Sequence, residues 1–161
     1  MIDAGRKALR VAGMLVVALL MAGCAGSAAT PKPTVAFDPS SDAHVAVQSA
    51  MSASRSDALR VMLVFGADWC TDSRVFASDL DSREAASLVA KFHVVRIDVG
   101  RADHNMDIDD QYGDPINAGI PAVVVLDSTG TVVADTSDGS LASARSLSLA
   151  AVLAKIQSWV G

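Results

Sequence analysis

The sequence predicts a single α/β domain in which short strands and helices alternate. Val61–Phe65 is a continuous apolar run, typical of a strand buried on both faces of a sheet. The runs Ala122–Leu126 and Thr131–Asp135 flank a turn signal at Asp127–Gly130 and predict a β-hairpin. Near the C-terminus, apolar residues recur at helical spacing and predict an amphipathic closing helix; they are Leu149, Val152, Leu153, Ile156 and Val160.

The other elements are predicted from weaker local signals. Residues 42–54 contain few helix breakers and predict a helix. Asp81–Glu84 resembles an N-cap with a supporting acid three residues later, which predicts a second helix up to about Phe92. Val94–Val99 predicts a strand, and residues 100–119 form an acidic segment that we expect to be irregular.

The N-terminal segment has the features of a secretory signal. Basic residues precede the apolar run Val11–Gly23, which is shorter than the about 20 residues that span a bilayer. The run ends in two small residues before Cys24, which resembles a bacterial lipobox with Met21 in place of the usual Leu. This pattern predicts cleavage before Cys24 and lipidation of its sulfur. The alternative is a plain signal peptide that happens to contain a cysteine.

These features divide the chain into a signal peptide at 1–23, a flexible tether at 24–40 and a domain at 41–161. The whole chain has a net charge of −5, and residues 1–23 hold three basic residues and one acidic residue, so residues 24–161 carry −7. This acidity argues against nucleic-acid binding and against electrostatic adhesion to anionic lipids. We expect attachment to the membrane through the lipid on Cys24.

The stretch from Phe65 to Ser73 follows the buried strand directly and predicts a helix that begins near Cys70. Its Trp69-Cys70 pair resembles the W-C-x-x-C motif of the thioredoxin-like fold family, with Ser73 in place of the second cysteine. The order strand–helix–strand–hairpin–helix is also that of this family. The resemblance covers roughly residues 41–161 and implies a central mixed β-sheet flanked by helices on both faces.

A second resemblance lies at Gly119–Leu126, which is similar to the family segment in which a cis-proline precedes a strand. It implies that Pro121 is cis, lies beside Cys70, and is preceded by a residue, Ile120, whose backbone pairs with a bound extended peptide. Asp98-Val99-Gly100-Arg101 and Tyr112-Gly113 match a secreted bacterial subgroup of the family. With the lipobox, this places the protein in the cell envelope facing the periplasm. The residue after Cys24 is Ala25, and by resemblance to other bacterial lipoproteins this implies sorting to the outer rather than the inner membrane.

The chemistry of Cys70 is limited by Ser73, because a hydroxyl cannot resolve a mixed disulfide. A helix N-terminus favours the reactive thiolate, whereas the neighbouring Asp68 and Asp72 disfavour it, and the sequence does not decide between these effects. A hydrogen bond from the Ser73 hydroxyl, one helical turn later, would favour the thiolate. Val64 stands where many family members have a buried acid that assists the second cysteine.

Two functions remain open at this point. One is a monothiol protein in which Cys70, with Trp69 and Ser73, forms mixed disulfides with protein thiols or disulfides or with glutathione. The other is a redox-inactive module that holds an extended polypeptide beside Pro121; copper delivery is a distant third. We expect a monomer with no cofactor and no metal site, because the acidic residues of 103–114 fail the EF-hand spacing and the histidines are scattered, at His44, His93 and His104.

The lipobox generates the first prediction. Cys24→Ala removes the lipid-bearing sulfur, so we expect an unprocessed or soluble protein instead of one that fractionates with membranes. Fractionation and the mass of the mature N-terminus measure this. A variant that fractionates like the wild type and is cleaved at the same bond would contradict lipidation at Cys24.

Overall fold

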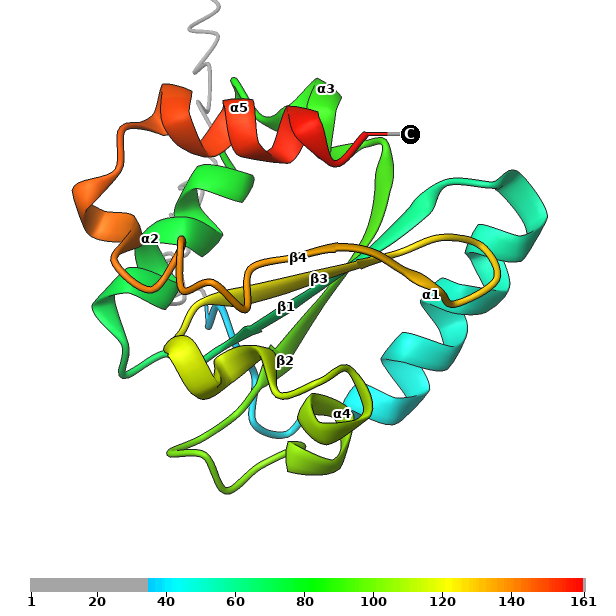
Figure 1. Cartoon of the computed structure of the whole chain (residues 1–161), viewed down its shortest axis with the longest axis horizontal. Coiled ribbons are helices and arrows are strands. Elements are labelled where there is room, and N and C mark those ends of the chain that lie inside the picture. The colour runs from blue at the N-terminus through cyan, green and yellow to red at the C-terminus, as the bar shows by residue number, and fades with distance from the viewer. Residues whose placement is uncertain (1–34, 161) are drawn as a thin grey trace, which may run out of the picture. The chain divides into compact units, whose positions relative to one another are not determined.

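The computed structural model describes residues 35–160, so the predicted signal peptide, Cys24 and most of the tether lie outside the described residues. Within this range no helix is long and apolar enough to cross a membrane. The elements in chain order are α1 (Ala43–Asp57), β1 (Arg60–Gly66), α2 (Thr71–Leu80), α3 (Ala86–Val89), β2 (Phe92–Asp98), α4 (Met106–Gln111), the 3₁₀ turn η1 (Pro115–Ala118), β3 (Ala122–Leu126), β4 (Val132–Asp135), the 3₁₀ turn η2 (Ala144–Ser146) and α5 (Leu149–Ser158) (Figure 1).

The four strands form one mixed sheet in the order β2-β1-β3-β4. β1 is parallel to β2 and antiparallel to β3, with Phe65 opposite Ala122 at the end nearest Cys70. β3 and β4 form the predicted hairpin, whose register shifts between Val125 and Leu126. All of β3, and β1 from Val61 onward, are buried, which explains their unbroken apolar sequences.

Helices cover both faces of this sheet, as predicted. Met62 and Val64 of β1 face one hydrophobic cluster, to which α2, α3 and α5 contribute. Leu63 and Phe65 face the other cluster, to which α1 and α4 contribute. Figure 1 shows the two sets of helices on opposite sides of the strands. The alternation of β1 side chains therefore builds two cores, one on each face.

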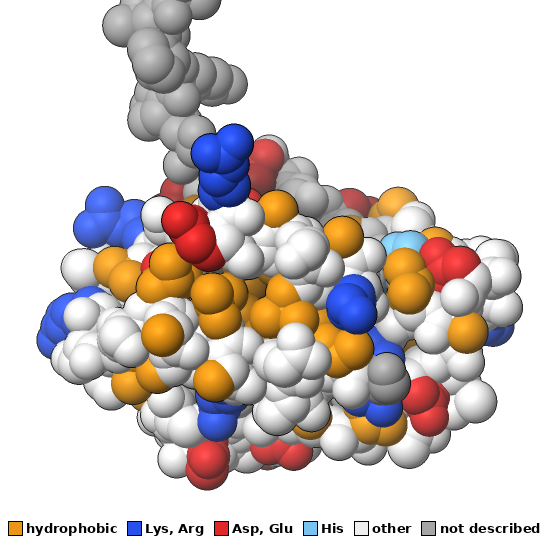
Figure 2. All heavy atoms as spheres, turned by 90° about the horizontal axis from the view of Figure 1, so that it is seen from above, with side chains coloured by type: hydrophobic (Ala, Val, Ile, Leu, Met, Phe, Trp, Pro, Cys, Tyr) orange, Lys and Arg blue, Asp and Glu red, His pale blue; other side chains and the backbone are white. Residues whose placement is uncertain are grey.

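The outer surface of the α3 and α5 side carries small apolar side chains. Figure 2 views this side and shows a band of hydrophobic residues between charged groups at its edges. In α5, Val152 and Ile156 are buried, whereas Ala150, Ala151 and Ala154 are exposed. The helix is thus anchored by two large residues and presents mainly alanine to solvent.

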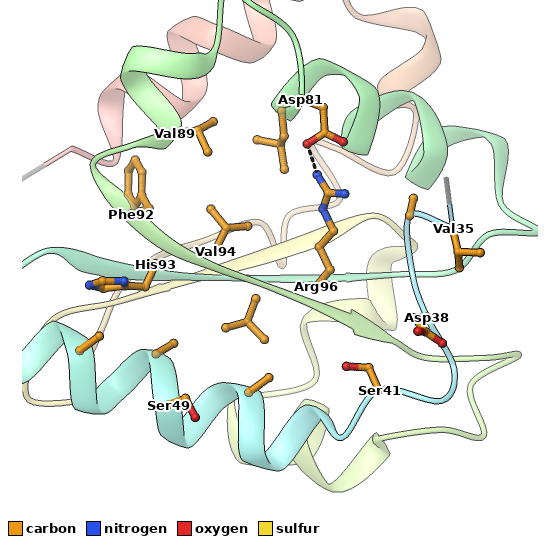
Figure 3. Close-up of a pocket in the computed structure, with 16 residues that line it drawn as sticks. Val35, Asp38, Ser41, Ser49, Asp81, Val89, Phe92, His93, Val94 and Arg96 are labelled. Atoms are coloured by element: carbon orange, nitrogen blue, oxygen red, sulfur yellow. Dashed lines mark hydrogen bonds and ion pairs between the residues drawn. The ribbon is translucent and has the colours of Figure 1, made fainter. Parts of the chain in front are cut away.

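β2 is an edge strand, and a groove of about 780 Å³ runs along it between α1 and the end of α2 (Figure 3). Phe92 and Val94 supply part of its apolar lining. Arg96 crosses the groove to Asp81, with 2.7 Å between Nη2 and Oδ1. A charged side chain at a sheet edge discourages pairing with another sheet.

The helix predicted from Asp81 to Phe92 is wrong. Asp81 is the C-cap of α2, and it is Ser82 whose hydroxyl accepts a hydrogen bond from the Ala85 amide, at 3.2 Å. The following helix, α3, spans only four residues, and Phe92 begins β2. The Ser82 hydroxyl thus stabilises the turn before α3, whose own N-cap, Ala85, has no capping side chain.

The irregular segment predicted at 100–119 contains two short helices, α4 and η1, so this expectation is also corrected. Asp109 in α4 is buried, and its carboxylate accepts a hydrogen bond from the Ile116 amide in η1, at 3.2 Å. Neither helix is long enough to show a helical repeat in the sequence. In the closing helix, Val160 lies just beyond the end of α5.

The folded part begins before residue 41, because Phe37, within the predicted tether, is fully buried. One oxygen of Asp68 accepts hydrogen bonds from the amides of Ala36, at 3.1 Å, and Phe37, at 2.9 Å. The Phe37 ring lies against Gly66, where a Cβ atom would overlap it. The segment before α1 is therefore fastened directly beside the end of β1.

This attachment generates a stability prediction. Asp68→Ala leaves two partly buried amides without their acceptor, so we expect the free energy of unfolding to fall by about 1–3 kcal/mol. Asp68→Asn retains an acceptor oxygen and should lose less than half of that. Urea unfolding of the three proteins measures the difference, and wild-type stability in Asp68→Ala would contradict the assignment.

Candidate functional site

Cys70 occupies the N-cap of α2, immediately after the turn that follows β1. Its amide donates to the Ala67 carbonyl at 3.0 Å, and its carbonyl accepts from the Arg74 amide at 3.1 Å, which starts the helix. The side chain is half-buried, and it is the free cysteine among the described residues. The thiol therefore lies where unpaired amides of the first helical turn favour negative charge.

The thiol faces the loop before β3, as the sequence implied. Cys70 Sγ donates a hydrogen bond to the Ile120 carbonyl at 3.5 Å. The Ile120–Pro121 peptide bond is cis, which confirms the prediction for this bond. Two segments 50 residues apart in the chain thus meet at the sulfur.

Ser73 lies one helical turn after Cys70 and is fully buried. Its hydroxyl has no hydrogen-bond partner within residues 35–160, so Ser73 does not bond to the Cys70 thiol in this structure. The thiol is turned toward Ile120 instead. Ser73 thus keeps an unused donor next to the helix start.

Trp69 is exposed, with 55% of its surface accessible, yet its position is fixed. Its Nε1 donates to the Gly100 carbonyl at 2.6 Å, and the Arg101 guanidinium lies 5.2 Å from the ring centroid. Such a placement of a cation over an indole face is favourable. The loop after β2 therefore holds the tryptophan beside Cys70.

A pocket of about 320 Å³ opens between Trp69 and Ile120. Its lining is mainly apolar and comes from Trp69, the loop 99–102, Ile116, Gly119 and Ile120. The pocket thus joins three segments: the turn before α2, the loop after β2 and the loop before Pro121. Sequence reasoning did not identify Arg101 as a site residue. The signal was its position just after a strand parallel to β1, because the carboxyl ends of neighbouring parallel strands share one edge of the sheet.

The two carboxylates that flank Cys70 are engaged elsewhere. Asp68 binds the amides of the segment before α1. Asp72 is buried, and it accepts from the Arg145 amide at 2.9 Å and lies 3.5 Å from that arginine's Nη1. Both charges therefore have donors of their own. Val64 lies in the apolar core, so no acid from that position reaches the site.

Three of the acidic residues after β2 form a cluster of neighbouring carboxylates. Carboxylate oxygens of Asp109, Asp110 and Asp114 lie within 4.8 Å of one another. Burial raises the pKa of Asp109, and a hydrogen bond with the Asp114 side chain raises the pKa of Asp110. Since Asp109 also holds the Ile116 amide, it supports the turn that leads toward Ile120.

The three histidines each pair with a different aspartate rather than with Cys70. Their partners, at 3.0, 3.0 and 3.2 Å, are Asp107 for His44, Asp57 for His93 and Asp98 for His104. Hydrogen bonding to His93 lowers the pKa of Asp57. Among residues 35–160 no histidine forms a hydrogen bond with the Cys70 thiol, whose partner is the Ile120 carbonyl.

Comparisons with known proteins agree with the fold. The sequence model of a family described as Thioredoxin-like matches residues 42–128. The crystal structure of a disulphide isomerase from Xylella fastidiosa Temecula1 is 40% identical, with a TM-score of 0.77, and the alignment covers 79% of this chain and 98% of that one.

Two other solved structures are more distant. A mutant thioredoxin from Halobacterium salinarum NRC-1 is 24% identical, with a TM-score of 0.46 and coverage of 66% and 79% of the two chains. A DsbH oxidoreductase is 22% identical, with a TM-score of 0.48 and coverage of 69% and 78%. A search of curated proteins gave no significant match. From the family match and the 40% identical relative, the chain belongs to the thioredoxin-like family.

Proposed function

We propose that this protein carries out thiol–disulfide exchange with one thiol, that of Cys70, and forms mixed disulfides with a protein or glutathione partner. The observation that carries the proposal is the position of the Cys70 sulfur, at the start of α2 and 3.5 Å from the Ile120 carbonyl, with Ser73 in place of a second cysteine. Partial exposure and a helix N-terminus both favour a nucleophilic thiol.

The reaction balances without a second thiol in this chain. The Cys70 thiolate attacks a partner disulfide, the Cys70–partner bond forms, and the other partner sulfur leaves as a thiolate. A thiol of the same partner can then attack the mixed disulfide and regenerate Cys70, which rearranges the partner's disulfides with no net oxidation. The 40% identical relative described as a disulphide isomerase supports this outcome.

An external thiol such as glutathione gives a different outcome. When glutathione attacks the Cys70 sulfur of the mixed disulfide, the partner leaves as a thiol and Cys70 is joined to glutathione. A second glutathione then releases Cys70 as oxidised glutathione forms. In this route the partner disulfide is reduced, and two glutathione molecules supply the electrons.

The neighbouring residues have separate roles in this proposal. Trp69 forms one wall of the site, and the backbone of Ile120, held before Pro121, pairs with an extended partner segment. Ser73, buried and without a hydrogen-bond partner in the described part of the chain, is available to donate to the sulfur once it carries negative charge. Ser73 thus has a role in catalysis, whereas Trp69 and Ile120 have roles in binding, and mutations can test each role separately.

The location of the protein is part of the same proposal. Cleavage before Cys24 and lipidation of its sulfur would anchor the chain in the bacterial envelope, facing the periplasm, with the outer membrane preferred over the inner one. The residues after Cys24 would then act as a tether for a monomeric domain. An extracytoplasmic compartment is where protein disulfides persist as substrates.

A second candidate function is a redox-inactive binding module. The exposed Trp69 and the apolar pocket beside it would also suit the capture of an extended segment without bond exchange. The two functions differ in one property, the reactivity of Cys70 toward disulfides.

The monothiol proposal predicts the results of two turnover assays. We expect the wild type to rearrange the disulfides of a scrambled test protein, Cys70→Ser to lose this activity, and both to show negligible insulin reduction with dithiothreitol. Ser73→Cys should form an intramolecular disulfide and gain insulin reduction, but only modestly, because Val64 supplies no carboxylate to deprotonate the new thiol.

The control is Ser73→Ala, which changes the same position without adding a thiol. Dithiol-like insulin reduction by the wild type would contradict the monothiol proposal. If Cys70 does not react with small disulfides in the folded protein, the binding module is the better description.

A further inference from the structure

The pocket beside Cys70 has a lining suited to an aliphatic or aromatic side chain. It measures about 320 Å³, and Val99, Ile116 and Ile120 supply much of its apolar wall together with Trp69. Two of the lining residues are neighbours of Cys70: Trp69 precedes it in the chain, and the Ile120 carbonyl accepts the hydrogen bond from its thiol. A side chain next to a partner's cysteine would therefore enter it.

Arg101 adds a charge to the rim of this pocket. The residue is exposed, lines the pocket and places its guanidinium over the Trp69 ring. Its guanidinium forms no ion pair among residues 35–160, where the ion pairs of arginine are those of Arg96 and Arg145. An unpaired guanidinium beside a binding pocket complements a carboxylate.

We infer that the preferred substrate is a polypeptide disulfide whose reacting cysteine is flanked by an apolar residue and an acidic residue. The apolar side chain fills the pocket and the carboxylate pairs with Arg101. Glutathione fits less well, because each half carries two carboxylates and an ammonium group, whereas the pocket offers one cation and an apolar wall. This inference rests on the proposed exchange chemistry of Cys70 and makes Arg101 a specificity-determining residue.

The test uses short peptides whose cysteine is joined in a disulfide to thionitrobenzoate. The Cys70 thiolate attacks the peptide sulfur, the Cys70–peptide bond forms, and thionitrobenzoate leaves as a coloured thiolate. The peptides carry Leu or Gly on one side of cysteine and Asp or Lys on the other, in both sequence orders, with the glutathione–thionitrobenzoate disulfide as a further substrate. Each rate constant is divided by the rate with methyl methanethiosulfonate, an uncharged small reagent, so that differences in thiol reactivity cancel.

We expect the Leu/Asp peptide to react on the order of tenfold faster than the Gly/Lys peptide and faster than the glutathione derivative, since burying one aliphatic side chain is worth at least this factor. Arg101→Glu should reverse the preference for Asp over Lys. The matched control is Arg83→Glu, which makes the same charge change at an exposed site in the turn after α2. This control should keep the wild-type preference.

The outcomes distinguish a failure of the inferred substrate preference from a failure of the proposed exchange chemistry. Reaction of Cys70 with the small reagent, but equal rates for all peptides or a faster glutathione derivative, would overturn this inference and leave the exchange chemistry standing. An unchanged Asp preference in Arg101→Glu would also overturn it. A thiol that fails to react with the small reagent would overturn the proposed function itself, and this inference with it.

Discussion

The antiparallel pairing of β1 with β3 is the constraint on which the site depends. Phe65 lies opposite Ala122 in this ladder, and both strands are buried, so a one-residue shift would move the side chains of the shifted strand from one core to the other. Cys70 follows shortly after the first strand and Ile120 lies just before the second. The register therefore brings the sulfur within 3.5 Å of the Ile120 carbonyl, although nothing in either local sequence requires that contact.

Charge around the thiol is organised by hydrogen bonds to the backbone. Asp68 binds the segment before α1, and Asp72 binds the turn η2. Both carboxylates are neighbours of Cys70 in the sequence, yet they act mainly as structural anchors. Arg101, in contrast, has its cation directed over Trp69 and open to a partner. The site thus combines a thiol at a helix start, an apolar pocket and a single unpaired cation.

The sequence was most informative where a long apolar pattern meets a strong turn signal. It located β1, the β3–β4 hairpin and the start of α2, because buried strands and turns leave clear residue patterns, whereas the cis bond at Pro121 followed from the resemblance to the family. It failed at α3 and α4, which are too short for periodicity, and at Asp81, where a local capping pattern was overridden by the end of α2. Phe37 and Arg101 were missed because their importance arises from contacts with distant segments.

The reactivity of the Cys70 thiol is the central claim, and one measurement tests it most directly. The rate of Cys70 with a small aromatic disulfide is measured at neutral pH in the folded protein and in the urea-unfolded protein, together with the amount of coloured thiolate released. The account predicts a faster reaction in the folded protein, one equivalent released, and a mixed disulfide that persists until an external thiol is added. A folded protein that reacts more slowly than the unfolded chain, or one that releases its mixed disulfide unaided, would contradict it.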